Sequence, residues 1–172
     1  MCGFVGVHSV NQKNIHSDIL LSMSKMLVHR GPDDSGVWIN NSNSIGFAHQ
    51  RLAVIDLTSA GHQPMHSSSN RFTIVFNGEI YNHHELRKEL NCLDWEGHSD
   101  TETLLTCIES WGIDKTLKKI NGMFAFALWD STECTMHLVR DRMGEKPLYF
   151  GWQGDSFLFG SELKALKIHP SF

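Results

Sequence analysis

The chain opens with a short run, residues 2–7, in which small and apolar residues alternate. This pattern predicts a buried strand, and glycines within a strand indicate that another group approaches the backbone closely. Later apolar runs are bounded by polar turn residues, which is typical of strands and hairpins. They predict strands at 37–39 with 45–48, 72–76, 124–129 with 135–139, and 148–152 with 157–160.

Helices are predicted where apolar residues recur every three or four positions. The segments with this spacing are 19–27, 83–90, 100–111 and 161–166. Two of them follow capping signatures, Asn82 with Glu85 and Ser99 with Glu102. Many strands are apolar on both faces, so we expect two packed antiparallel sheets with helices outside, in one domain over 1–172.

Composition excludes several classes of protein. Of the 172 residues, 41% are hydrophobic and 20% are charged, which is ordinary for a globular protein. The formal net charge of -4 gives no basic footprint for nucleic acid. No apolar run is long enough to span a bilayer, and no secretory signal is visible. We therefore expect a cytoplasmic protein that binds neither nucleic acid nor membrane.

The cysteines and histidines do not predict a metal site. The four cysteines are Cys2, Cys92, Cys107 and Cys134, and they form no C-x-x-C pair of the kind found in zinc or redox motifs. The eleven histidines are scattered along the chain. We expect the three later cysteines to be reduced and inert, which leaves Cys2 as the one in a notable position.

Cys2 becomes the first residue if Met1 is trimmed, as is usual before a small residue. It would then carry both a thiol, with a reference pKa of about 8.5, and an α-amine, at about 7.7–8.0. Such an amine can act as the base for its own residue's nucleophile. The alternative is that Cys2 is a small buried hydrophobic residue, and its position alone does not decide between the two.

Three further sites have both a chemical and a structural interpretation. Arg51 precedes an apolar run, where its guanidinium could bind a carboxylate or form a surface ion pair. Asn77 and Gly78 end a strand, where they could form a tight turn or offer an amide and a bare N–H to an oxyanion. Asp100 lies in the first turn of a helix, where the helix dipole alone could explain a carboxylate. The charged loop 140–142 could face a further domain, but we expect it to be a solvated charge cluster.

Several separated segments form a recognisable set along the chain: M-C-G-F-V-G, H-R-G-P-D-D-S-G, R-L-A-V-I-D-L with G-H-Q-P-M, F-N-G-E-I-Y-N, G-H-S-D-T-E, N-G-M-F-A-F-A-L-W-D and R-D-R-M-G-E-K-P-L-Y. Taken together, they resemble the glutamine amidotransferase domain of the asparagine synthetase family, whose nucleophile is an N-terminal cysteine. The resemblance covers nearly the whole chain. The family fold is a four-layer α/β/β/α sandwich, that of the N-terminal nucleophile hydrolases.

The resemblance implies a role for each candidate residue. Cys2, freed of Met1, would attack the carboxamide of L-glutamine, form a thioester and release ammonia and then glutamate. The Asn77 amide and the Gly78 N–H would stabilise the oxyanion. The substrate's amino-acid head would be held by the remaining site residues, Arg51 on the α-carboxylate, Glu79 and Asp100 on the α-ammonium, and backbone groups around Val54 and Ile55.

The resemblance also implies a partner domain that does not lie within residues 1–172. In asparagine synthetases an ATP-using synthetase domain follows, and its phosphate-binding loop is absent from this chain. ATP and Mg are expected only there, and the glutaminase half needs no metal or organic cofactor. We expect ammonia to pass to a larger enzyme, which can form a homodimer, with aspartate as the default acceptor. The alternatives are a sugar carboxylate acceptor in surface polysaccharide synthesis, a non-catalytic binding domain, or a related hydrolase acting on another amide.

Overall fold

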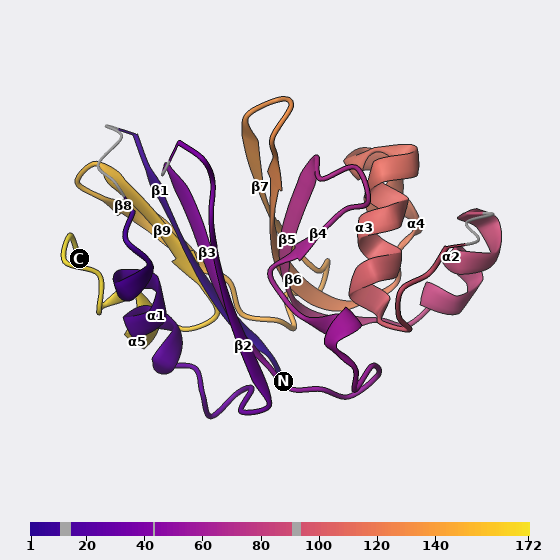
Figure 1. Ribbon diagram of the computed structural model, residues 1–172, viewed down its shortest axis with the longest axis horizontal. Coiled ribbons are helices and arrows are strands. Elements are labelled where there is room, and N and C mark those ends of the chain that lie inside the picture. The colour runs from indigo at the N-terminus through magenta and orange to yellow at the C-terminus, as the bar shows by residue number, and fades with distance from the viewer. Residues whose placement is uncertain (11–14, 43, 91–93) are drawn as a thin grey trace.

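The strands form two antiparallel sheets that pack face to face (Figure 1). The computed structural model describes residues 1–10, 15–42, 44–90 and 94–172, so Cys92 lies outside the described residues. Sheet A contains, in spatial order, β2 (Asp34–Ile39), β3 (Ile45–Arg51), β1 (Gly3–Ser9), β9 (Ser156–Gly160) and β8 (Tyr149–Gln153). Sheet B contains β4 (Met65–His66), β5 (Phe72–Ile80), β6 (Gly122–Asp130) and β7 (Thr135–Arg140).

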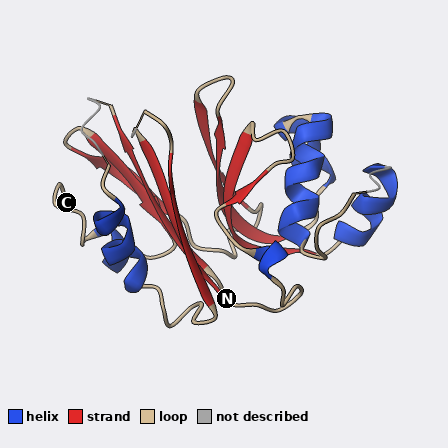
Figure 2. Cartoon of the chain, in the orientation of Figure 1, coloured by secondary structure: helices blue, strands red, loops and turns tan. Residues whose placement is uncertain are grey.

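Helices cover the outer face of each sheet (Figure 2). Sheet A is covered by α1 (Ser17–Lys25) and α5 (Leu163–Leu166). Sheet B is covered by α2 (His83–Leu90), α3 (Asp100–Trp111) and α4 (Ile113–Lys119), and a short 3-10 helix, η1 (Ser59–Gly61), lies in the connection between the sheets. The expected four-layer α/β/β/α sandwich is therefore confirmed.

Apolar side chains fill the three spaces between these four layers. One cluster lies under α2–α4, a second lies under α1 and α5, and a third separates the sheets. β1 is buried along almost its whole length. A side-chain carbon on Gly6 would lie 2.1 Å from the Phe159 ring, which explains the glycine in this strand. Close packing thus fixes β1, which begins one residue after Cys2.

The sequence pattern does not predict η1, β4 or α4, and two of its local interpretations differ from the structure. Asn77 and Gly78 lie inside β5, which pairs with β6 over nine residues, so the tight-turn interpretation is wrong. Asn82 does not cap α2 in the expected way, because its side-chain oxygen accepts a bond from the Asn121 N–H and its nitrogen donates to the Lys119 carbonyl. The Ser99 signature does cap α3, with its hydroxyl accepting from the Glu102 N–H at 3.1 Å.

No helix in the part of the chain that the structure describes is long and apolar enough to cross a membrane.

Candidate active site

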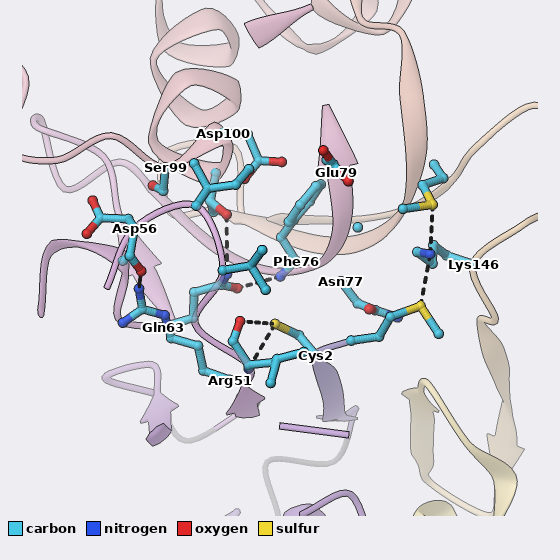
Figure 3. A pocket seen from close by; sticks show the side chains of 18 residues that line it. Cys2, Arg51, Asp56, Gln63, Phe76, Asn77, Glu79, Ser99, Asp100 and Lys146 are labelled. Carbon is cyan, nitrogen blue, oxygen red and sulfur yellow. Dashed lines mark hydrogen bonds between the residues drawn. The ribbon is translucent and has the colours of Figure 1, made fainter. Parts of the chain in front are cut away.

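An open cavity of about 160 Å³ lies at the end of the sandwich where the chain begins (Figure 3). Its walls come from the two residues before β1, the end of β3 and the segment after it, the later part of β5 and the first turn of α3, with single residues from β6 and from the loop after β7. All eight residues predicted as site residues line it: Cys2, Arg51, Val54, Ile55, Asn77, Gly78, Glu79 and Asp100. The fold therefore gathers into one place residues that are separated by almost 100 positions.

Cys2 is held in the cavity by the backbone of Leu52. The Leu52 N–H donates to Sγ at 3.3 Å, and Sγ–H points to the Leu52 carbonyl oxygen at 3.6 Å. Burial raises the pKa of the Cys2 thiol, while the Leu52 N–H, the nearby amino terminus and Arg51 act against this rise. Burial outweighs these effects, so the pKa of Cys2 stays above its ordinary value and the sulfur is held as the thiol.

Asn77 presents unpartnered polar atoms at this cavity. Its side chain is fully buried, and neither its amide nitrogen nor its oxygen has a partner among the described residues. A buried amide without partners is costly, so its presence is usually explained by a ligand or water that completes it. The side chain is therefore available to bond a group placed in the cavity.

The free edge of β5 gives the cavity a second donor. The Phe76 N–H donates to the Gln63 side-chain oxygen at 2.6 Å, and the Ile80 N–H donates to the Asp100 carboxylate at 2.8 Å. Backbone N–H groups alternate along a strand, so the Gly78 N–H points to this same edge, between the two occupied positions. Side chains thus occupy the flanking N–H groups and leave that of Gly78 for a ligand.

Arg51 lies at the end of β3 and is almost fully buried. Its guanidinium donates to the Thr58 carbonyl at 2.9 Å and to the Asp56 carbonyl. Arg51 therefore does not form a surface ion pair, because it is buried and its partners are backbone carbonyls. These bonds anchor the loop that precedes η1. A guanidinium has five N–H donors, so three remain for a bound carboxylate.

The apolar residues that follow Arg51 form a loop of this cavity wall rather than a core strand. Val54 is 72% exposed and Ile55 is 40% exposed, and both line the cavity. Their side chains are therefore not part of the hydrophobic core.

Two carboxylates lie on the side of the cavity opposite Cys2 (Figure 3). Burial raises the pKa of Asp100 to about 6, and the negative charge of Glu79 adds to this rise. Bonds from backbone N–H groups, including that of Ile80, act in the opposite direction. A cation bound between these two acids would favour their ionised forms. The pair therefore forms a cation site that is electrostatically unfavourable while it is empty.

Several residues at the site were not predicted individually. Gln63 is buried, and it joins β5 to Thr101 of α3 through its side-chain amide. Lys146 lines the cavity with its Nζ 3.0 Å from the sulfurs of both Met1 and Met123. The loop that carries Lys146 is bonded to the buried Asp141 carboxylate, so this charged stretch is not simply solvated. Gln63, Asp141 and Lys146 all lie within the matching sequence segments. No sequence pattern distinguishes them from surface residues.

Within the described residues, no group of three or more His, Cys, Asp or Glu side chains is arranged to hold a metal ion.

Comparisons with known proteins agree with the motifs. Residues 1–172 match the family described as a glutamine amidotransferase domain. Asparagine synthetase (glutamine-hydrolysing) 3 of Bacillus subtilis is 41% identical over 175 residues, which cover 99% of this chain and 28% of that protein. The asparagine synthetase of Zea mays is 38% identical over 168 residues, 96% of this chain and 28% of that protein. The chain therefore spans less than a third of the length of these two relatives.

A solved structure supports the fold independently. Glutamine phosphoribosylpyrophosphate amidotransferase from Bacillus subtilis, complexed with ADP and GMP, superposes with a TM-score of 0.77. The two proteins are 22% identical, and the match covers 97% of this chain and 43% of the other. At this identity the likeness concerns the fold alone.

Proposed function

This chain belongs to the glutamine amidotransferase domain family, and from that premise we propose that it hydrolyses L-glutamine to glutamate and ammonia. The observation that carries the proposal is the cavity itself. It combines a cysteine sulfur, an unpartnered amide, a buried guanidinium and two carboxylates. A free amino acid with a side-chain amide needs one partner of each of these kinds.

Cys2 is the nucleophile in this proposal, after Met1 has been removed. The freed α-amine accepts the thiol proton, and the sulfur attacks the carboxamide carbon. The C–N bond then breaks, and the amine returns its proton to the leaving nitrogen, which departs as ammonia. Water attacks the resulting γ-glutamyl thioester, the amine accepts a proton from it, and glutamate leaves with the thiol restored.

The Asn77 side-chain nitrogen and the Gly78 N–H stabilise the oxyanion that forms in both steps. Donors that are fixed before the reaction act strongly in a site from which water is excluded. The Gln63 and Asp100 bonds to β5 support this role, because they hold the strand edge on both sides of Gly78.

The other predicted residues bind the amino-acid head of glutamine. Arg51 binds the α-carboxylate through the N–H groups that do not anchor its own loop. Asp100 and Glu79 bind the α-ammonium. Backbone groups of Val54 and Ile55 complete the wall beside the substrate.

The ammonia serves a larger amide-forming enzyme in this proposal. The relatives are named as glutamine-hydrolysing asparagine synthetases, and this chain spans about 28% of the two compared above. We propose a synthetase domain that uses ATP and Mg, with aspartate as acceptor and a sugar carboxylate as the alternative. The cytoplasm suits this role, because a reducing compartment keeps the thiol free.

Glutamate release from glutamine by the chain that begins at Cys2 tests the proposal. We expect steady release by the processed wild type and none by Cys2→Ala. Cys134→Ser is the matched control, since this cysteine is exposed in the turn after β6 and should not affect the rate. A chain with a residue added before Met1 should be inactive, because Cys2 then lacks a free amine. Undiminished activity in Cys2→Ala would contradict the mechanism.

A further inference from the structure

The backbone of Cys2 is anchored by a side chain and not by the sheet. The β1–β3 ladder begins at the pair of Gly3 and Gln50, so Cys2 lies just outside it. Its carbonyl oxygen accepts a hydrogen bond from Arg30 Nε at 2.9 Å. The position of the nucleophile's main chain therefore depends on where this guanidinium is held.

Glu162 holds that guanidinium from the far end of the chain. Arg30 Nη1 donates to Glu162 Oε1 at 3.0 Å, and the two side chains are only 12% and 23% exposed. The arginine side chain passes close over Gly3, where an added Cβ would lie 3.0 Å from its Cδ. Two acceptors thus fix the planar guanidinium, the Cys2 carbonyl on one side and the Glu162 carboxylate on the other.

The carboxylate of Glu162 is itself fixed relative to β1. The neighbouring Ser161 is fully buried and exchanges two hydrogen bonds with Phe4, at 2.9 and 3.0 Å. Lys164 Nζ lies 3.1 Å from Glu162 Oε2, and His29 Nε2 lies 3.0 Å from Oε1. The bonds between Ser161 and Phe4 therefore hold Glu162 beside the first residues of β1, independently of Arg30.

We propose that Glu162 is a positioning residue for the nucleophile, acting through Arg30 on the carbonyl of Cys2; this inference rests on the proposed glutaminase function. The thiol and the α-amine of the processed chain both belong to Cys2, so one anchor sets the direction of both. Small displacements of reacting groups reduce rates strongly. Arg30 and Glu162 lie outside the lining of the cavity, so they affect the reaction without touching glutamine.

Steady-state kinetics of the processed chain tests this role. We expect Glu162→Ala to lower kcat for glutamine hydrolysis about tenfold to a hundredfold and to leave KM within about twofold, since no substrate contact is lost. Glu162→Gln keeps an acceptor for Arg30 but forms a weaker, uncharged bond. It should therefore give a kcat between those of wild type and Glu162→Ala.

A matched control separates positioning from stability. Asp130 is also a buried acid paired with an arginine, since its carboxylate accepts from Arg71 at 2.9 and 2.6 Å. It lies at the opposite end of β6 from Met123, which lines the cavity. Asp130→Asn should lower the melting temperature and leave kcat unchanged.

A double-mutant cycle tests whether Glu162 acts through Arg30. In an Arg30→Ala background, the further change Glu162→Ala should cause no additional loss of kcat, because the intermediary is already absent. Additive losses would overturn the proposal, and so would a Glu162→Ala variant with wild-type kcat. If that variant does not fold, a wild-type kcat in Glu162→Gln overturns it instead. Failure of the wild type to release glutamate would contradict the proposed function as well, which distinguishes the two results.

Discussion

At the scale of single residues, Asn77 tests the proposed oxyanion site. Its side chain is buried, and both of its polar atoms lack a partner in the described part of the chain. Asn77→Ala should lower kcat by about 10²–10³, as the loss of one oxyanion donor does elsewhere. Stability should be unchanged or higher, since no hydrogen bond within the fold is lost. Glutamate release and thermal unfolding measure the two effects.

Asn82 provides the control for that substitution. Its amide bonds both Lys119 and Asn121, so Asn82→Ala should reduce stability by about 1 kcal/mol while kcat stays at the wild-type value. If both variants lost activity equally, a specific role for Asn77 would be contradicted.

Asp100 couples binding to stability through its pKa. This pKa is about 6 in the fold, against an ordinary value of 3.8. Between these values the folded state binds a proton that the unfolded state has released, so stability falls as pH rises through this window. Asp100→Asn removes this dependence, and it should stabilise the unliganded chain at pH 8 by about 1–3 kcal/mol relative to wild type.

Denaturant unfolding at pH 4 and pH 8 measures the effect. The difference in unfolding free energy between wild type and Asp100→Asn should be small at pH 4 and larger at pH 8. The same variant should raise KM for glutamine, because the α-ammonium loses a carboxylate. If the unfolding free energy of the wild type rose relative to that of Asp100→Asn when the pH was raised from 4 to 8, the pKa of Asp100 would not be raised in the fold.

At the scale of elements, η1 and the loop that precedes it position Arg51. A Cβ on Gly61 would lie 2.0 Å from Arg51 Nη2. Gly61→Ala should therefore displace the guanidinium and raise KM about tenfold or more, with a smaller effect on kcat. Gly151→Ala in β8 is the matched control, because nothing lies within 4 Å of the added carbon. An unchanged KM in Gly61→Ala would show that the loop does not control substrate binding.

The elements also show what sequence patterns could and could not predict. Apolar periodicity predicts most of the strands and helices but not β4, η1 or α4, and Ser99 caps α3 as its signature indicates. Asn82 has the same kind of signature, but tertiary contacts with the segment after α4 take its amide instead. Asn77 with Gly78 resembled a turn because the pairing of β5 with β6 is a long-range property.

Side chains that act through other side chains were the hardest to predict. The side chains of Cys2, Arg51 and Asp100 have chemistry that suggests a role at a site. Each of them also lies in a motif of the same family. Gln63 and Glu162 gain their importance from partners 13 and 132 positions away, at the Phe76 N–H and at Arg30. No local periodicity encodes such pairings, so only the folded chain shows them.

At the scale of the whole molecule, sheet A brings the first residues of the chain beside the turn that follows β9. β1 lies between β3 and β9, and the turn after β9 carries Ser161 and Glu162 to the first residues of β1. The sheets pack through rings such as Phe47 and Phe159. Cys2 is therefore supported by the full fold, and we expect the proposed glutaminase activity to disappear with global unfolding and not before it.

In the proposed mechanism, a freed Cys2 attacks the carboxamide of glutamine. The intact mass of the chain, with peptide mapping, after brief incubation with glutamine and quenching in acid, tests this step. We expect an added γ-glutamyl group on Cys2 of the chain that begins there, and none in Cys2→Ala or in a chain that retains Met1. Glutamate release without any such adduct on Cys2, or an adduct on another residue, would contradict it.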